Sequence, residues 1–358
     1  MRVVVIGAGL LGSAVADELA AAGASVAVLE AGSPGRGTSG SSFAWINAQD
    51  KAPEAYFALN AEGVATYPAL ARELGGNWYH SGGDLLVGRG PGAAKVAEKA
   101  QRHRALGYPV RELDRTVVAE LEPDLEVLAD GDFAAAHFPD EAWIDAPALV
   151  ERRLARARER GADVHVGRAV TGLEASGVAT DDGPNPADVV LLAAGVASER
   201  LAGLAGVRLP MAPNPGLLAT TEPVGGRLAH VVHAGGVALR PAGDGRVLLS
   251  SREVDAALPP ETRELEPEDD PCSDLLARAA RVLPVLQTAQ IERARIGVRS
   301  VASDGLPVAG YAPGVDNLYL LVAHSGATLA PVLGRLVAAE LLGGREARLD
   351  DYRPARFA

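Results

Sequence analysis

Three glycines near the start of the chain, Gly7, Gly9 and Gly12, have the spacing G-x-G-x-x-G. In this spacing the first glycine permits a tight turn, the second lets the backbone approach a pyrophosphate, and the third lets a helix pack closely against a strand. Glu30 ends the next apolar run, where a carboxylate can accept hydrogen bonds from both ribose hydroxyls. Its negative charge disfavours a 2′-phosphorylated dinucleotide, so these residues alone predict a site for FAD or NAD.

The residues around these glycines predict the strand-helix-strand unit that such a site needs. Residues 3–6, VVVI, form a β-branched run typical of a strand buried on both faces of a parallel sheet. Residues 10–22 are good helix formers, Gly23 is placed to end the helix, and SVAVLE at 25–30 predicts the next strand. The helix directs its free amides and positive dipole end at a phosphate. We therefore expect an α/β fold (α+β overall) with a Rossmann-type nucleotide-binding domain.

The composition limits the classes of partner. At 358 residues the chain is long enough for two domains. No apolar run approaches the roughly 18 residues that a membrane helix needs, and the first expected strand begins directly after Met1, without room for a signal peptide. We expect a soluble, cytoplasmic protein with no membrane span. A net charge of −12, from 34 basic and 46 acidic residues, repels the phosphates of nucleic acids and anionic lipids, so neither is an expected partner.

The sequence does not indicate a metal site. The single cysteine, Cys272, excludes an internal disulfide, and its acidic surroundings, EPEDDPCSD, predict a solvated loop. His230 and His233 are spaced as H-V-V-H, but no acidic or cysteine partner lies nearby in the sequence. We therefore expect neither zinc nor redox chemistry at these residues.

Three further stretches show how the nucleotide site continues along the chain. Residues 31–49, AGSPGRGTSGSSFAWINAQ, are too rich in small residues for a simple crossover helix and suit backbone lying along an extended ligand. Residues 187–198, ADVVLLAAGVAS, predict a buried strand that ends in a small-residue turn. Residues 318–342 predict another buried strand, a turn at HSG and a long apolar helix, which again places a small-residue turn at a helix N-terminus.

These stretches together resemble the D-amino acid oxidase superfamily of flavoproteins, which includes glycine oxidase, sarcosine oxidase and D-amino acid dehydrogenases. The resemblance covers most of the chain. It rests on the G-T-S segment at 37–39, the A-A-G turn at 193–195, and a closing signature that reads GVRS at 297–300, DGLPVAG at 304–310 and AHSG at 323–326. Two residues depart from that signature, because Ser300 replaces a proline and Ala323 replaces a glycine.

The resemblance implies FAD as the cofactor. The residues at matching positions are Gly7, Gly9, Gly12, Glu30, Thr38, Ser39, Ala194, Gly195, Gly326, Ala327 and Thr328. The last three would direct backbone amides at the flavin pyrimidine carbonyl, where reduction develops negative charge. Residues 42–48 would line the flavin ring, with Trp45 and Asn47 shaping the pocket or, for Trp45, filling the core. We expect the FAD to be non-covalent, because the cysteine that attaches flavin in sarcosine oxidases has no counterpart here.

The sequence offers three catalytic candidates, the first of which is implied by the resemblance. Arg299 occupies the arginine position of G-x-R-P, where the guanidinium would grip a substrate carboxylate; the alternative is a structural ion pair. Arg240 lies on an expected substrate-domain strand and is the second candidate. His324 would contact flavin or substrate, or serve as a satisfied histidine at a strand end. The tyrosine that relatives carry at 236–239 is absent, as is the oxygen-activating lysine in the strand resembling residues 245–253, so altered substrate contacts are expected and oxygen is in doubt as the acceptor.

The expected organisation is two interleaved domains. Residues 1–70, 140–210 and 292–358 would form the FAD-binding domain, and residues 71–139 and 211–291 a substrate-binding domain built on an antiparallel sheet. The leading hypothesis is an FAD-dependent oxidoreductase in which an amino acid or secondary amine gives a hydride from its α carbon to flavin N5 and leaves as an imine that water hydrolyses. The alternatives are an NAD-dependent dehydrogenase, or a non-catalytic FAD-binding scaffold or assembly factor of the same fold. The sequence indicates no particular oligomeric state.

Overall fold

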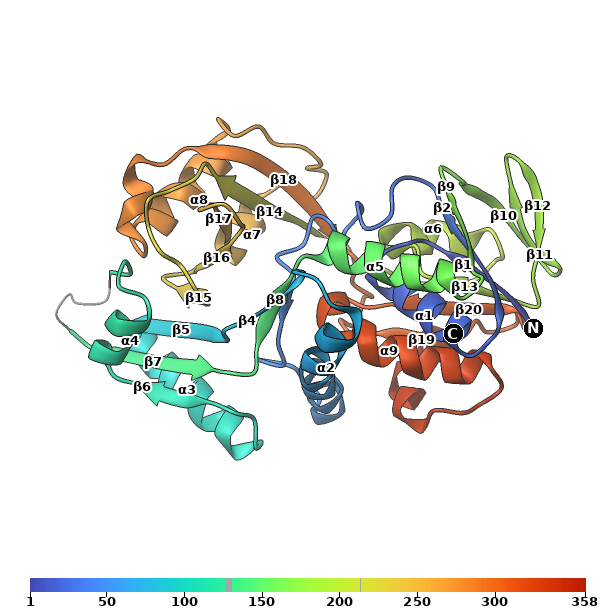
Figure 1. The fold of residues 1–358 in the computed structure, drawn as a ribbon, viewed down its shortest axis with the longest axis horizontal. Coiled ribbons are helices and arrows are strands. Elements are labelled where there is room, and N and C mark those ends of the chain that lie inside the picture. Colours follow the sequence, from blue (N-terminus) through green and yellow to red (C-terminus); the bar gives the residue numbers. More distant parts are fainter. Residues whose placement is uncertain (127–130, 213) are drawn as a thin grey trace.

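A computed structural model describes residues 1–126, 131–212 and 214–358, and its two larger sheets lie toward opposite ends of the molecule (Figure 1). The six-stranded sheet has the order β19 (Val308–Tyr311), β20 (Leu318–Val322), β13 (Val189–Leu192), β1 (Arg2–Ile6), β2 (Ser25–Glu30) and β9 (Asp163–Val166). Its neighbours are parallel except for β19, which pairs antiparallel with β20 at one edge. The Rossmann-type sheet expected from the sequence is confirmed.

The central strand β1 is buried on both faces because its alternate side chains enter different cores. Val3 and Val5 join the core beneath the helices α1 (Leu10–Ala21), α5 (Ala146–Glu159) and α9 (Gly326–Leu341). Val4 and Ile6 join a second core formed with α6 (Ser198–Gly203) and a small sheet of β10 (Val170–Glu174), β11 (Gly177–Thr180) and β12 (Gly183–Pro186). Helix α1 packs against both α5 and α9 and thereby places its N-terminus at the end of β1 (Figure 1).

The eight-stranded sheet combines both inserted segments. Its order is β18 (Ile291–Arg299), β14 (Asn214–Thr221), β17 (Val247–Ser250), β16 (Val237–Pro241), β15 (Val231–Ala234), β5 (Asp84–Arg89), β7 (Phe133–Phe138) and β6 (Arg111–Leu113). All its pairings are antiparallel except β15 with β5, the junction between the two inserts. Since β18 belongs to this sheet, the chain returns to the six-stranded sheet after Arg299.

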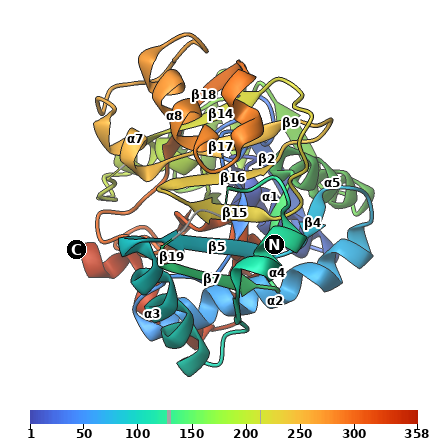
Figure 2. The same ribbon diagram turned by 90° about the vertical axis from the view of Figure 1, so that its left-hand side faces the viewer.

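Helices cover the eight-stranded sheet, and one of them corrects an expectation. Helix α8 (Asp270–Ala280) packs on β14, β16 and β17 and lies beside α7 (Arg252–Ala257) (Figure 2). Cys272 is on this helix and is fully buried, together with Leu275 and Ala279 on the same face. The predicted solvated loop is therefore wrong: the acidic residues around Cys272 form the exposed start of a helix whose apolar face is in the core. Burial raises the pKa of the Cys272 thiol to about 11.

A small sheet and two further helices connect the ends of the molecule. The small sheet has the order β3 (Trp45–Ile46), β8 (Ala142–Ile144) and β4 (Tyr79–Ser81). Helix α2 (Glu54–Leu74) follows β3 and packs against α9, while α3 (Pro91–Ala105) covers β5 and β7 (Figure 1). The remaining short helices are α4 (Arg115–Leu121), η1 (Gly195–Ala197), η2 (Pro284–Thr288), η3 (Ala347–Tyr352) and η4 (Pro354–Phe357).

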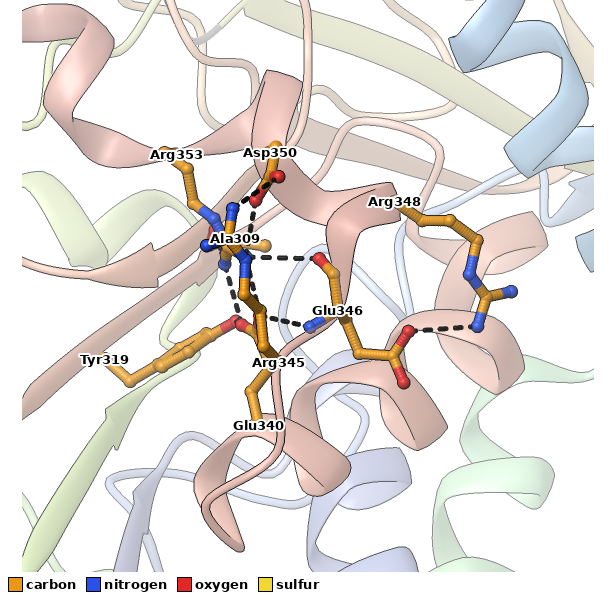
Figure 3. Close-up of polar contacts among 8 residues, drawn as sticks. All are labelled: Ala309, Tyr319, Glu340, Arg345, Glu346, Arg348, Asp350 and Arg353. Carbon is orange, nitrogen blue, oxygen red and sulfur yellow. Dashed lines mark hydrogen bonds and ion pairs between the residues drawn. The ribbon is translucent and has the colours of Figure 1, made fainter.

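The C-terminal segment is held against the six-stranded sheet by an ionic cluster around the buried Glu340 carboxylate (Figure 3). The Glu340 carboxylate on α9 accepts hydrogen bonds from both terminal nitrogens of Arg353, at 2.6 and 2.7 Å. It also accepts one from the hydroxyl of Tyr319 on β20 at 2.7 Å. Glu340 is 7% exposed, so the charge is compensated where water cannot screen it. These contacts hold η3 and η4 against β19 and fix the position of α9.

Candidate active site

A cavity of about 470 Å³ runs from the carboxyl ends of β1, β2 and β13 to residues of β18 and the start of α9. In open α/β sheets this edge is where ligands bind. Ten of the eleven residues expected to bind cofactor line the cavity: Gly7, Gly9, Glu30, Thr38, Ser39, Ala194, Gly195, Gly326, Ala327 and Thr328. The eleventh, Gly12, packs against Gly7 behind the cavity wall. The structure thus brings together residues that are more than 300 positions apart in the sequence.

The glycine spacing makes a cradle that side chains would fill. Gly7 has φ +100°, and a Cβ there would come within 2.6 Å of the Ala193 carbonyl oxygen on the neighbouring strand. A Cβ on Gly12 would lie 2.0 Å from the Gly7 carbonyl oxygen, so only glycine lets α1 approach the end of β1. The residues present therefore fit a pyrophosphate at the N-terminus of α1.

Side chains from two later segments complete the cradle. The Glu30 carboxylate accepts hydrogen bonds from the backbone nitrogens of Ala8 and Gly32, each at 2.8 Å. Ser39 Oγ accepts a hydrogen bond from the Leu10 backbone nitrogen at 3.1 Å. These contacts hold the G-T-S segment at the first turn of α1, and Glu30 keeps further lone pairs that can accept from ribose hydroxyls.

The hydroxyl of Thr38 and the turn after β13 close the cavity on the side of β18. Thr38 Oγ1 donates to the Val298 carbonyl oxygen at 2.9 Å, which joins the G-T-S segment to the end of β18. Gly195, with φ +59°, lies close to Ser300, and both line the cavity. Ser300, which replaces the proline of the closing signature, is therefore part of the cavity wall.

The start of α9 is joined to the segment expected beneath the flavin ring. Thr328 Oγ1 accepts from the Asn47 backbone nitrogen at 3.1 Å and donates to the Asn47 carbonyl oxygen at 3.3 Å. Tyr56 on α2 shares a 2.8 Å hydrogen bond with Ser325. Trp45 and Asn47 both line the cavity. The helix N-terminus is thereby fixed with its first amides beside this wall, where they can meet an anion or a carbonyl oxygen.

The other end of the cavity, which we call the cationic end, is lined by the cations Lys51 and Arg299 and by His324. Arg299 forms an ion pair with Asp255 and also donates to the Pro215 carbonyl oxygen at 3.1 Å. His324 lines the cavity with part of its surface exposed, and desolvation, with the charges of Lys51 and Arg299 nearby, lowers its pKa to about 4. The imidazole is therefore neutral at physiological pH and offers one donor and one acceptor nitrogen.

Arg240, the second catalytic candidate, does not line this cavity. Its side chain is 8% exposed, and its guanidinium lies over the ring of Trp143 at 4.2 Å. Nε donates to the Phe43 carbonyl oxygen at 2.7 Å, and a terminal nitrogen donates to the Pro241 carbonyl oxygen at 2.7 Å. Burial lowers the pKa of Arg240 to about 9. The geometry assigns Arg240 to the support of the segment at Phe43, behind the cavity wall.

The histidines of H-V-V-H do have acidic partners, contrary to the expectation from the sequence. His230 Nδ1 lies 2.7 Å from Glu122, and His233 Nδ1 lies 2.6 Å from Asp84. Both carboxylates are distant in the sequence, so only the fold shows the pairs. Within residues 1–126, 131–212 and 214–358, no three His, Cys, Asp or Glu side chains are grouped as metal ligands.

Sequence reasoning missed Lys51 of the cationic end and Asp255, the partner of Arg299. Lys51 lines the cavity although it belongs to no motif, and Asp255 pairs with Arg299 from α7, a helix that the sequence analysis did not predict. The one available signal for Lys51 was its position directly after the segment expected to line the ring. Asp255 gave no local signal, because the pairing spans 44 residues.

Comparison with known proteins now decides the family. Residues 2–340 match the DAO family, described as FAD dependent oxidoreductase. The chain belongs to this family. FAD is accordingly its cofactor, and the NAD-dependent alternative is not supported. The superfamily resemblance inferred from the glycine spacing, the G-T-S segment and the closing signature is confirmed.

Individual relatives of this FAD-dependent oxidoreductase span nearly its whole length. Glycine oxidase of Pseudomonas aeruginosa is 30% identical over 376 residues, covering 99% of this chain and 98% of the relative. The crystal structure of glycine oxidase from Geobacillus kaustophilus superposes with a TM-score of 0.87 at 26% identity, covering 99% of both chains. The structure of iminodiacetate oxidase from Chelativorans sp. BNC1 gives a TM-score of 0.83 at 25% identity, also covering 99% of both chains.

The helices of this DAO-family chain were also compared with what a membrane span requires. In the part of the chain that the structure describes, no helix is both long enough and apolar enough to cross a bilayer.

Proposed function

We propose that this flavoprotein oxidises the C–N bond of an amino acid or a secondary amine that carries a carboxylate. The observation that carries the proposal is the continuity of one cavity, which joins the glycine cradle at α1 to the cationic end. A dinucleotide in the cradle would direct its ring toward Arg299, His324 and the start of α9. The names of the relatives, glycine oxidase and iminodiacetate oxidase, support this class of substrate.

The roles of the residues follow from their chemistry. FAD, when bound, supplies the acceptor for the hydride that leaves the substrate α carbon. Arg299 keeps donor N–H groups beyond those used by Asp255 and Pro215, and we assign to them the substrate carboxylate. Neutral His324 adds no further charge and can hydrogen bond to the substrate amine. Trp45 and Phe43 form an apolar part of the wall that excludes water from the reacting carbon.

We assign the parts of FAD to the residues that the sequence indicated. The glycine cradle and Ser39 would bind the pyrophosphate, Glu30 the ribose, and the start of α9 the flavin pyrimidine. In this assignment the segments 1–70, 140–210 and 292–358 carry FAD, and the inserted segments 71–139 and 211–291 carry the substrate side. We further propose that FAD is bound without a covalent link, since Cys272 is buried on α8 and does not line the cavity.

Anaerobic reduction of the bound flavin tests the function. The purified, FAD-loaded protein would be mixed without oxygen with a panel of D- and L-amino acids, glycine, N-methyl amino acids and simple amines. We expect carboxylate-bearing amines, and not the simple amines, to bleach the visible absorbance of the flavin. A flavin that no amine reduces would instead support a non-catalytic FAD-binding scaffold.

The cellular location is part of the same proposal. A negatively charged chain with a single, buried cysteine fits the reducing cytoplasm. Fractionation of cells that express the natural protein would test a cytoplasmic location, and recovery with the membrane fraction would contradict it.

A further inference from the structure

Lys51 is a cation in the cavity wall that has no partner in the part of the chain that the structure describes. It is partly buried and lines the cavity, yet its ammonium makes no hydrogen bond or ion pair with any described residue. Its neighbours in sequence and space are already committed: Asp50 pairs with both Lys99 and Arg102. A charge that is removed from water is costly unless an opposite charge meets it.

The positive charge of Arg299, the second cation at the cationic end, is compensated by a carboxylate of the protein. Arg299 is paired with Asp255, which is 8% exposed and also accepts a 2.7 Å hydrogen bond from the Leu217 backbone nitrogen. Asp255 is therefore held in place, and the pair together carries no net charge. Lys51 supplies the positive charge that remains uncompensated.

Two acidic groups attract the Lys51 ammonium without bonding to it: Asp50, which is paired with Lys99 and Arg102, and Glu141, which is fully buried and accepts hydrogen bonds from Trp45, Gln49 and Tyr108. Neither of them lines the cavity.

Among the described residues, Glu30 is the one acidic side chain that lines the cavity, and it lies at the cradle. Its backbone carbonyl oxygen accepts a hydrogen bond from the Arg168 backbone nitrogen. Near the cationic end, Arg252 at the start of α7 adds positive charge that acts on both Lys51 and His324. An arriving molecule therefore meets the uncompensated Lys51 ammonium and no free carboxylate among the described residues that line this end.

We propose that Lys51 binds a second anionic group of the substrate, so that the preferred substrates are amino dicarboxylates: one carboxylate on the donor groups of Arg299 and the other on the Lys51 ammonium. This inference rests on the proposed amine oxidation and narrows it to a substrate class. A flexible lysine suits the more variable end of a substrate, whereas the guanidinium fork suits the carboxylate next to the reacting carbon. Burial, with Arg252 nearby, lowers the pKa of Lys51 to about 8, which an anion at the ammonium would reverse.

The test measures a selectivity ratio. For wild type and variants at equal flavin loading, the anaerobic reduction rate at sub-saturating concentration would be measured for matched pairs: glycine with iminodiacetate, and alanine with aspartate in both enantiomers. We expect the second carboxylate to raise the wild-type rate at least tenfold in one pair. In Lys51→Met the ratio of the dicarboxylate rate to the monocarboxylate rate should fall to within about twofold of one, roughly 0.4 kcal/mol, and Lys51→Arg should retain most of the wild-type ratio.

A binding measurement separates substrate recognition from chemistry. Unreactive succinate and malonate, compared with propionate and acetate, would be titrated into the FAD-loaded protein and followed by the shift of the flavin spectrum or by calorimetry. We expect the dicarboxylate to bind at least tenfold more tightly than the monocarboxylate in wild type, and equally in Lys51→Met. Lys95→Met is the matched control, because Lys95 is exposed on α3, away from the cavity, and this variant should behave as wild type.

The outcomes distinguish this inference from the function on which it rests. If no amine reduces the flavin, the proposed function fails, although the binding titration still reports on Lys51. If amines reduce the flavin but the wild-type ratio is within twofold of one in every pair, the dicarboxylate class is wrong. If Lys51→Met slows mono- and dicarboxylates by the same factor, Lys51 acts on the common reaction and the inference is overturned.

Discussion

Arg299 and Asp255 form an ion pair whose two partners are both fixed to the same strand, β14. Asp255 accepts a hydrogen bond from the Leu217 backbone nitrogen at 2.7 Å, and Arg299 donates to the Pro215 carbonyl oxygen at 3.1 Å. The guanidinium is therefore held in one orientation at the cavity wall before any substrate arrives. Such preorganisation is what a carboxylate clamp needs, because the substrate does not bear the cost of ordering the side chain.

Replacement of Arg299 should slow flavin reduction without loss of cofactor. Arg299→Lys keeps the charge but loses the fork, and Arg299→Ala also leaves Asp255 unpaired, so we expect the alanine variant to lose more, about 2–5 kcal/mol of transition-state binding. FAD content should stay near wild type. The measurement is the anaerobic reduction rate with the best substrate of the screen at equal flavin loading. Rates that agree within about twofold, roughly 0.4 kcal/mol, would make the ion pair purely structural.

Replacement of Glu30 should weaken FAD retention. Glu30→Ala removes a charged acceptor for ribose hydroxyls, worth about 1.5–3 kcal/mol, and also frees the backbone nitrogens of Ala8 and Gly32. The FAD dissociation constant should therefore rise at least tenfold, as measured by flavin fluorescence. Glu98→Ala, on the exposed face of α3, serves as the control. An unchanged affinity in Glu30→Ala would remove this residue from the site.

Acid precipitation should release all of the flavin into the supernatant. The only cysteine, Cys272, is buried on α8 in the core beside the eight-stranded sheet, and burial keeps its thiol protonated. Absorbance of the supernatant and of the redissolved pellet gives the measurement. Yellow colour that stays with the pellet after complete denaturation would show a covalent link.

His324 should make the protein sensitive to acid. Folding lowers the pKa of His324 from its ordinary value of 6.5 to about 4, so the unfolded chain binds more protons than the folded chain between these two values. The contribution of His324 to stability is thus present above pH 6.5 and is lost as the pH falls toward 4. The free energy of unfolding, measured by chemical denaturation, should fall less from pH 7 to pH 5 in His324→Gln than in wild type. An equal loss in both proteins would indicate that other groups dominate the acid response.

Two arginines that share Asp350 should differ in their effect on stability. Arg353 pairs with buried Glu340 as well as with Asp350, whereas Arg345 pairs with Asp350 alone and is 79% exposed (Figure 3). Arg353→Ala leaves the Glu340 carboxylate buried without its cation and should cost about 3–5 kcal/mol of unfolding free energy. Arg345→Ala, the matched control, should have no measurable effect, since exposed pairs contribute little. Similar midpoints of denaturation for both variants would contradict this distinction.

The cofactor side of this protein follows from local sequence. The turn at Gly7, the close approach at Gly12 and the following helix depend on the backbone freedom of single residues and on contacts between neighbouring elements. The β-branched run at 3–6 likewise indicates that strand β1 is buried on both faces. Such features need only the residues themselves and their immediate neighbours, and for that reason the fold class and a dinucleotide site could be predicted from the residues alone. The choice of FAD over NAD came from the resemblance to a known family.

The substrate side was decided by tertiary structure. The Arg299 pair with Asp255, the position of Lys51 in the cavity and the acidic partners of His230 and His233 all join segments that are remote in sequence. No periodicity or spacing encodes which charge a folded chain places opposite another. Arg240 illustrates the same limit, because its sequence neighbourhood suits a substrate contact while packing against Trp143 directs its guanidinium elsewhere. The sequence by itself determined the fold and the nucleotide cradle, whereas the balance of buried charge at the cationic end arises only when both sheets enclose one cavity, because desolvation and charge pairing depend on distances in space.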